Sequence, residues 1–348
     1  MMRLPPFVYL APRELDEAVR LLADHGPEAM PVAGGTDLFP NMKRRQVEPK
    51  VLVGLRGLRE LQGITAEADG GLRIGAGVVL RRIVEHPAVV QRVPVLARAA
   101  ATISNPQIRC MGTVGGNLLV DTRCNYYNMP YWWRRAIDFC MKKDGDTCWV
   151  APGGHRCWAI SSSDLAPVLV ALEAQVRLAG ARGERTIPVA DLYRDDGIVY
   201  LGKAPDEVLV EVRVPPADGL RATYWKLRRR GAIDFPILGV AAAVRMAPDG
   251  TCTAARIVLG AVASQPVRCE AAERVLLGQQ LGPAVIDAAA EAAWKPAKPL
   301  DNADLTLGYR KAMVRVYVRR ALREVAGLPV ADVAPSAERM AVRRTEHW

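Results

Sequence analysis

Four of the seven cysteines fall within one short stretch, at Cys124, Cys140, Cys148 and Cys157. Four clustered thiolates form a soft ligand set that suits zinc or an iron–sulfur cluster. The steps of 16, 8 and 9 residues between them lack the paired arms of common zinc ribbons, so the pattern favours an iron–sulfur cluster over structural zinc. Unrelated buried thiols remain an alternative. Cys110 lies outside the stretch, and we interpret it as a packing thiol.

Two turns with adjacent glycines offer a different chemistry. The first Gly-Gly turn, residues 32–37 (VAGGTD), follows a short apolar run, and the second Gly-Gly turn, residues 112–117 (GTVGGN), comes soon after PQIR. Adjacent glycines let the backbone bend tightly and point several N–H groups at an anion such as a diphosphate. One such turn alone is usually structural, but two in one domain favour anion binding. Neither is a Walker A loop, and Gly75-Ala76-Gly77 lacks the third glycine of a Rossmann fingerprint, so a bound dinucleotide requires a non-Rossmann fold.

Two further motifs carry charge. In SSSDLAP, residues 161–167, Ser163 or Asp164 is expected to cap the following helix, and a neighbour of the cap can still face a ligand. In KLRRR, alternation along a strand would place Lys226, Arg228 and Arg230 on one face. Such a row is either an exposed edge or a cationic group beside an anionic cofactor.

Composition narrows the class of protein. The 348 residues suggest about two domains, and half of them are apolar, enough for sizeable cores. The net charge is +10, but the basic residues are spread and no nucleic-acid-binding signature accompanies them, so we do not expect nucleic-acid binding. The N-terminus lacks the apolar stretch of a signal peptide, and no run approaches the roughly 20 residues of a membrane span. We therefore expect a cytoplasmic protein with reduced thiols and no disulfides.

Hydrophobic periodicity predicts alternating helices and strands up to a linker at residues 215–219. The helices expected there are 13–25, 80–103 with interruptions at Pro87 and Pro94, and 165–172; the strands are 29–33, 51–55, 71–75, 174–178 and 207–214. After the linker, strands at 222–228, 236–246 and 252–262 precede helices at 268–277, 283–295 and 306–326. Strands followed by helices indicate a separate α+β domain.

Residues 121–160 differ from their surroundings. They contain four of the seven cysteines and four of the seven tryptophans, and their periodicity is poor. Metal ligation can replace a hydrophobic core in a small segment, so we expect a metal-nucleated loop here.

Taken together, these motifs resemble the FAD-binding subunit of the xanthine dehydrogenase family of molybdenum hydroxylases. The resemblance covers about residues 4–326 and rests on AGGTDL (33–38), QIRCMGTVGGN (107–117), SDLAPVL (163–169), DEVLVEVRVP (206–215), KLRRRGAIDF (226–235) and the stretch 309–322. Most members pass from the second Gly-Gly turn to the Ser-x-x-Asp motif in about a dozen residues. The segment 121–160 resembles the insertion of 4-hydroxybenzoyl-CoA reductase β subunits, which binds a 4Fe–4S cluster; Cys124, Cys140, Cys148 and Cys157 fall on its ligand positions.

The resemblance implies an α+β fold. It consists of a FAD-binding domain of two α/β subdomains at residues 1–216, which carries the 121–160 insertion, a C-terminal α+β domain at 217–326, and a tail at 327–348. It implies a FAD- and 4Fe–4S-containing electron-transfer subunit of a reductase that removes the phenolic hydroxyl of an aromatic CoA thioester. The implied partners are a molybdopterin-binding large subunit and a 2Fe–2S small subunit in a dimer of heterotrimers, with ferredoxin as electron donor.

Roles carry over by position. Ala33, Gly34, Gly35, Thr36 and Asp37 would cradle the FAD diphosphate, and Thr113, Gly115, Gly116 and Asn117 would hold the other side of the dinucleotide. Asp164 and Lys226 would lie near the flavin, Leu209 would pack on the flavin or the adenine, and Tyr193 would approach the ring. Two alternatives stay open: the FAD subunit of an aromatic or N-heterocycle hydroxylase that passes electrons outward, and a zinc-stapled scaffold without flavin.

Overall fold

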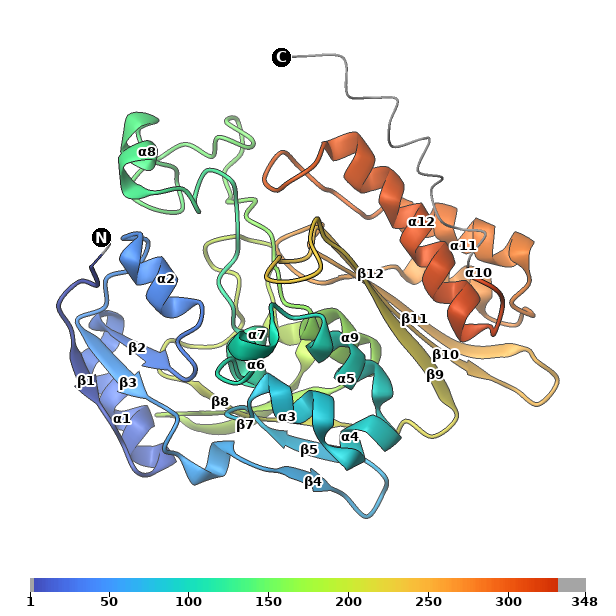
Figure 1. The fold of residues 1–348 in the computed structure, drawn as a ribbon, viewed down its shortest axis with the longest axis horizontal. Helices are drawn as coiled ribbons and strands as arrows, with labels where there is room; N and C mark the ends of the chain where they lie inside the picture. The colour runs from blue at the N-terminus through green and yellow to red at the C-terminus, as the bar shows by residue number, and fades with distance from the viewer. Residues whose placement is uncertain (1–2, 331–348) are drawn as a thin grey trace.

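The structure is a computed structural model that describes residues 3–330. Within this range it contains three β-sheets, with helices packed against and between them (Figure 1). Residues 331–348, most of the predicted tail at 327–348, lie outside the described part. No helix within residues 3–330 is both long enough and apolar enough to cross a membrane.

The first sheet is a small parallel sheet that positions the first Gly-Gly turn. Its strands are β1 (Val8–Leu10), β2 (Ala29–Val32) and β3 (Val51–Gly54), in the order β1-β3-β2. Helix α1 (Leu15–His25) packs on it through an apolar stripe at helical spacing, formed by Leu15, Ala18, Val19 and Leu22. The first Gly-Gly turn joins the end of β2 to α2 (Leu38–Lys43).

The second sheet has five antiparallel strands and the largest core. In the order β4-β5-β8-β6-β7, its strands are β4 (Ile64–Ala66), β5 (Leu72–Gly75), β8 (Val208–Val214), β6 (Gln175–Gly180) and β7 (Gly183–Pro188). Four helices belong to this part of the fold: α3 (Leu80–Glu85), α4 (Pro87–Arg92), α5 (Pro94–Ala101) and α9 (Leu165–Ala171). Their apolar faces and one face of the sheet form a single buried cluster.

The third sheet is antiparallel, in the order β12-β11-β10-β9, and is buried on both faces. Its strands are β9 (Leu220–Leu227), β10 (Leu238–Met246), β11 (Cys252–Gly260) and β12 (Val267–Arg268). Along β10, Ala241 and Ala243 face the core of the second sheet, whereas Val240, Ala242 and Val244 face the C-terminal helices. Those helices are α10 (Glu270–Leu276), α11 (Pro283–Trp294) and α12 (Leu307–Val325).

The remaining elements are single turns of helix. They are η1 (Gly26–Glu28), η2 (Arg59–Leu61), α6 (Pro106–Arg109), α7 (Val114–Leu118), α8 (Tyr131–Ala136) and η3 (Val189–Leu192). The predicted α+β class and the long elements are confirmed, and the interrupted stretch 80–103 forms α3, α4 and α5. The sequence does not predict the strands β1, β4, β7 and β12, because β1, β4 and β7 are largely exposed and β12 has only 2 residues. The division at 216/217 stays a prediction, since the third sheet shares a buried core with the second.

Candidate functional site

The first Gly-Gly turn presents a row of unused backbone donors. Within residues 3–330, the N–H groups of residues 33–37 donate to no protein acceptor. Gly35 has a φ of 68°, a left-handed conformation that favours glycine. Successive free N–H groups in such a turn form an anion-binding concavity, so this turn fits a diphosphate.

The second Gly-Gly turn does not repeat this arrangement. Its N–H groups are used inside the protein: Gly115 donates to the Ala76 carbonyl at 2.8 Å, Gly116 to the Thr113 hydroxyl at 3.0 Å, and Asn117 to the Thr113 carbonyl at 2.9 Å. Thr113 is the N-cap of α7, which consumes the donors of the turn. The prediction of a second nest of free N–H groups is therefore wrong. Gly116 is exposed, and the Asn117 side-chain nitrogen has no hydrogen-bond partner within the described residues.

The two turns nevertheless lie against each other. A Cβ atom on Gly34 would stand 2.0 Å from the Met111 carbonyl oxygen, so only glycine allows this approach. Asp37 of the first turn forms an ion pair with Arg123 at 3.1 Å. Burial raises the pKa of Asp37, and the Arg123 guanidinium partly offsets this rise.

Asn117 joins the second turn to the serine-rich motif. Its side-chain oxygen accepts hydrogen bonds from the Ser163 hydroxyl at 2.8 Å and from the Leu165 N–H at 3.1 Å. The Ser163 hydroxyl also accepts from the Ala166 N–H at 3.0 Å, which confirms Ser163 as a cap of α9. Asp164 has no capping bond, and its side chain is turned to another set of partners.

Asp164 meets the C-terminal sheet in a buried network. Its carboxylate accepts a hydrogen bond from the Tyr224 hydroxyl at 2.7 Å and pairs with the Lys226 ammonium at 2.9 Å. Burial raises the pKa of Asp164, and Lys226 and Tyr224 act against this rise. Burial likewise lowers the pKa of Lys226. The first turn, the second turn, Asp164 and Lys226 thus form one continuous line of contacts.

The KLRRR motif is therefore not an exposed row on a strand. The Lys226 side chain is only 2% exposed, and β9 ends at Leu227, so Arg228 and Arg230 lie beyond the strand. Arg228 donates to the Thr102 carbonyl at 3.0 Å, an oxygen that it shares with Lys226, whereas Arg230 pairs with Asp234 at the surface. Only Lys226 of this row joins the buried network.

Two other predicted site residues lie in the core. Leu209 is buried in β8 opposite Leu178. Tyr193 is buried and donates a hydrogen bond to the Leu118 carbonyl at 3.0 Å, at the end of α7. Burial raises the pKa of the Tyr193 hydroxyl. Tyr193 thus touches the second-turn region, and Leu209 lies next to Val210, whose carbonyl accepts from Ala76.

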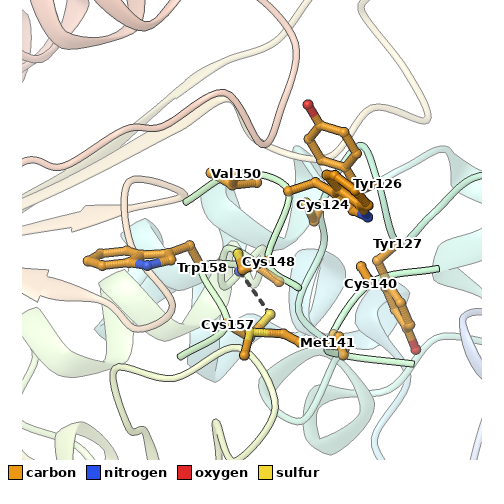
Figure 2. Close-up of a pocket in the computed structure, with 12 residues that line it drawn as sticks. Cys124, Tyr126, Tyr127, Cys140, Met141, Cys148, Val150, Cys157 and Trp158 are labelled. Carbon is orange, nitrogen blue, oxygen red and sulfur yellow. Dashed lines mark hydrogen bonds between the residues drawn. The ribbon is translucent and has the colours of Figure 1, made fainter. Parts of the chain in front are cut away.

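The four clustered cysteines line one small cavity in the insertion (Figure 2). All four are buried, and none forms a disulfide. Burial raises the pKa of Cys124 to about 12 and that of Cys157 to about 11, and in both cases nearby thiols add to the rise. The thiols are thus close enough to interact electrostatically, as an electron-rich ligand set requires.

The donor set consists of four thiols, the ligand type that thiolate-bound iron–sulfur clusters use. Within residues 3–330, no three His, Cys, Asp or Glu side chains converge tightly enough to hold one metal ion. A tetrahedral zinc site would bring its sulfurs to about 3.8 Å from one another, given Zn–S bonds of about 2.3 Å. Four thiols around one cavity with aromatic and apolar walls fit the chemistry of thiolate-bound iron–sulfur clusters. The space between them measures about 10 Å³, room for one water molecule.

Several residues at these sites carry no signal in the sequence. Lys142 lines the cysteine cavity, and Gly197 packs so closely that a Cβ atom there would stand 2.6 Å from the Cys157 sulfur. Tyr224 donates a hydrogen bond to Asp164 and completes this network. The alternating pattern of β9 alone does not indicate a functional tyrosine at that position. The interpretation of Cys110 as a packing thiol is wrong, because this cysteine is exposed.

Two protein families match consecutive parts of the chain. Residues 5–217 match the family described as the FAD binding domain in molybdopterin dehydrogenase, and residues 222–325 match the CO dehydrogenase flavoprotein C-terminal domain. The chain is 31% identical over 322 residues to the 6-hydroxypseudooxynicotine dehydrogenase complex subunit alpha of Paenarthrobacter nicotinovorans, covering 92% of this chain and 95% of that protein.

A second relative is known both as a sequence and as a structure. The carbon monoxide dehydrogenase medium chain of Hydrogenophaga pseudoflava is 32% identical over 319 residues, covering 91% of this chain and 96% of that protein. A solved structure of carbon monoxide dehydrogenase from the same organism, which lacks the Mo-pyranopterin moiety, superposes with a TM-score of 0.77 at 32% identity. The superposition covers 94% of this chain and 99% of the chain of that carbon monoxide dehydrogenase.

Proposed function

Because the chain belongs to the family of FAD-binding subunits of molybdenum hydroxylases, we propose that it is the flavin subunit of a molybdenum dehydrogenase that hydroxylates an aromatic or N-heterocyclic substrate. In this role it accepts electrons from a partner subunit and passes them outward. The relative named 6-hydroxypseudooxynicotine dehydrogenase complex subunit alpha supports this substrate class. A zinc-stapled scaffold without flavin does not fit a member of this family.

The observation that carries the proposal is the row of five free N–H groups at residues 33–37. We propose that Ala33, Gly34, Gly35, Thr36 and Asp37 hold the FAD diphosphate. The line of contacts that begins there leads through the second turn to Asp164 and Lys226.

Residues along this line of contacts are proposed to hold the other side of the cofactor. We propose that Gly116 and Asn117 face the dinucleotide, while Thr113 and Gly115 support them through the cap of α7 and its packing on Ala76. Asp164 and Lys226 lie near the flavin, and Leu209 and Tyr193 shape the wall behind it. FAD supplies the redox chemistry when bound, and these residues bind and orient it.

A second candidate function rests on the cysteine cavity. We propose that Cys124, Cys140, Cys148 and Cys157 bind a 4Fe–4S cluster, as in 4-hydroxybenzoyl-CoA reductases. On this candidate, electrons from ferredoxin enter the complex and drive reductive removal of a phenolic hydroxyl from an aromatic CoA thioester. The insertion favours this candidate, and the named relatives favour the dehydrogenase.

Both candidates require the same kind of assembly. We propose that the protein works in the cytoplasm with a molybdopterin-binding large subunit and a 2Fe–2S small subunit, as a dimer of heterotrimers. The substrate site then lies on the large subunit. This chain contributes cofactor binding and electron transfer.

One purification of the complex tests the proposal. Flavin analysis should give one FAD per copy of this chain, and iron and acid-labile sulfide beyond those of the small subunit should come to about four each per copy. Assays with an N-heterocycle plus an electron acceptor, and with reduced ferredoxin plus an aryl-CoA thioester, then separate the two candidates. A complex without flavin would contradict both. A complex with flavin but no additional iron would contradict the cluster and leave the dehydrogenase.

A further inference from the structure

Lys142 is a buried cation in the wall of the cysteine cavity. Its side chain is 7% exposed, and it is the sole charged residue among the described residues that line the cavity. Lysine is rarely buried to this extent unless it is paired, because removing an ammonium group from water is costly. Its partners therefore indicate what the charge does.

The Lys142 ammonium is held by acceptors from two segments. It donates to the Asp121 carboxylate at 2.6 Å, to the Thr122 carbonyl at 3.1 Å and to the Gly197 carbonyl at 2.9 Å. The Thr122 hydroxyl is a further partner. Gly197 in turn donates its N–H to the Cys157 carbonyl at 2.9 Å. Lys142 thus pins the loop around Gly197 against one of the four cysteines.

The ion pair has a direction. The Lys142 ammonium lines the cavity and acts to lower the pKa of the Cys157 thiol, whereas Asp121 accepts from the Tyr127 hydroxyl at 2.9 Å and acts on Asp37 and Arg123. Lys142 lines the cavity and Asp121 does not, so the ammonium is the member of the ion pair that borders the cysteines. Beyond Asp121, Arg123 and Asp37 continue the series as far as the first Gly-Gly turn. Charges of alternating sign thereby connect the two sites.

We propose that Lys142 supplies a fixed positive charge in the wall of the cysteine cavity. This charge raises the reduction potential of the group bound there. The inference rests on the iron–sulfur cluster proposed above. One-electron reduction of a thiolate-bound cluster adds one negative charge and no proton. In a cavity with apolar walls, a nearby fixed cation stabilises that added charge. Without the cation, reduction becomes less favourable.

The test compares two adjacent lysines in the intact complex. Lys142→Met removes the buried charge, and Lys143→Met is the matched control because Lys143 pairs with Asp144 nearer the surface. Each variant is analysed for iron, and the midpoint potential of the cluster is measured by redox titration followed by electron paramagnetic resonance. We expect Lys142→Met to shift the reduction equilibrium at least about tenfold toward the oxidised form, about 59 mV for one electron. Lys143→Met should shift it less than about twofold.

Two further variants separate charge from packing. Asp121→Asn removes the negative partner of Lys142 and should raise the midpoint potential, whereas Lys142→Met should lower it. If both variants merely loosened the loop, their shifts would not have opposite signs. Lys142→Arg keeps the positive charge and should have a midpoint potential near that of the wild type. If the methionine variant fails to fold, the arginine and Asp121→Asn variants carry the test. Unchanged potentials in Lys142→Met and Asp121→Asn, with iron present, would overturn the role of Lys142 alone. A wild-type complex without the additional iron would overturn the cluster, and this role with it.

Discussion

The two Gly-Gly turns have similar sequences and opposite structures. In the first, at residues 32–37, the N–H groups of residues 33–37 have no protein acceptor within the described chain. In the second, at residues 112–117, Gly115, Gly116 and Asn117 all donate their N–H groups within the protein. Paired glycines therefore indicate that a backbone bends tightly, but the surrounding elements decide whether its donors stay free.

The position of the threonine relative to the glycine pair causes this difference. A threonine before the second glycine pair caps a helical turn, α7, and the capped helix uses the donors at its start. In the first turn the threonine comes after the glycines, and α2 begins only at Leu38, so the donors before it remain available. The order of threonine and glycines thus distinguishes the turn whose N–H groups stay free from the turn whose N–H groups are used within the protein.

The largest effect is expected for Gly34→Ala in the first turn. The new methyl group would stand 2.0 Å from the Met111 carbonyl oxygen, a backbone atom that cannot move aside, so the turn must shift away from the position in which we propose that it holds the cofactor. We expect the FAD content of the purified complex to fall at least about tenfold, or about 1.4 kcal/mol in binding free energy. The flavin-to-protein absorbance ratio measures this.

A matched glycine provides the control. Gly308 lies in the first turn of α12, where an added Cβ atom meets no atom within 4 Å. Gly308→Ala should leave the flavin content unchanged. Full flavin in Gly34→Ala would show that the first turn does not hold the cofactor, and the contrast between the two turns would lose its functional meaning.

Thr36→Val should have the next largest effect, on affinity alone. Thr36 makes no hydrogen bond within the described chain, so its hydroxyl is free to donate to a phosphate oxygen. A hydrogen bond to a charged group contributes about 1.5–3 kcal/mol, so its loss should weaken FAD binding at least about tenfold. Titration of the apoprotein with FAD measures the affinity. Thr65→Val, on the exposed edge of β4, is the control, and equal affinities in the two variants would contradict the role of Thr36.

Much of the fold could be predicted from the sequence, because long periodic segments carry their own signal. The apolar stripe of α1 and the buried runs of β3 and β10 were readable, and their bounds differ from prediction by a few residues. The short helix α7 was not, because one turn of helix has no periodicity. The sequence therefore gives no sign that α7 uses the N–H groups of the second turn.

The sequence predicts some parts of the candidate sites better than others. Residues that lie close together along the chain are the easier ones to group into a site. The convergence of the cysteines was readable, since the four lie within one segment. The pairing of Asp164 with Lys226 joins residues 62 positions apart and depends on α9 packing against β10 and β11 and on α5 packing beside β9, which no local pattern reveals. The burial of Lys142 has no signal in the sequence, because a lysine next to another lysine is typical of a solvated surface.

Gly115→Ala tests the supporting role of the second turn and should act on stability. An added Cβ atom would lie 2.9 Å from the Ala76 side chain and 3.1 Å from its carbonyl oxygen, so the helix must move off the strand end. Overpacking of this kind costs about 1–3 kcal/mol, which urea unfolding can measure. The folded fraction should bind FAD with an affinity close to that of the wild type. Loss of FAD without loss of stability would instead make the second turn a direct ligand site, like the first.

Thr113→Ala should have the smallest effect and most directly sharpens the contrast between the turns. It removes the hydroxyl that accepts the Gly116 N–H at 3.0 Å, and loss of an N-cap costs about 1 kcal/mol. Thr113→Ser keeps the hydroxyl but lacks the methyl group, and its stability should be close to that of the wild type. If the methyl group were responsible, Thr113→Ser would be as unstable as Thr113→Ala. The Gly116 N–H freed in Thr113→Ala becomes a donor like those of the first turn. If the variant binds FAD more tightly while its midpoint of urea unfolding falls, the capping hydroxyl is what keeps the second turn from acting as a nest.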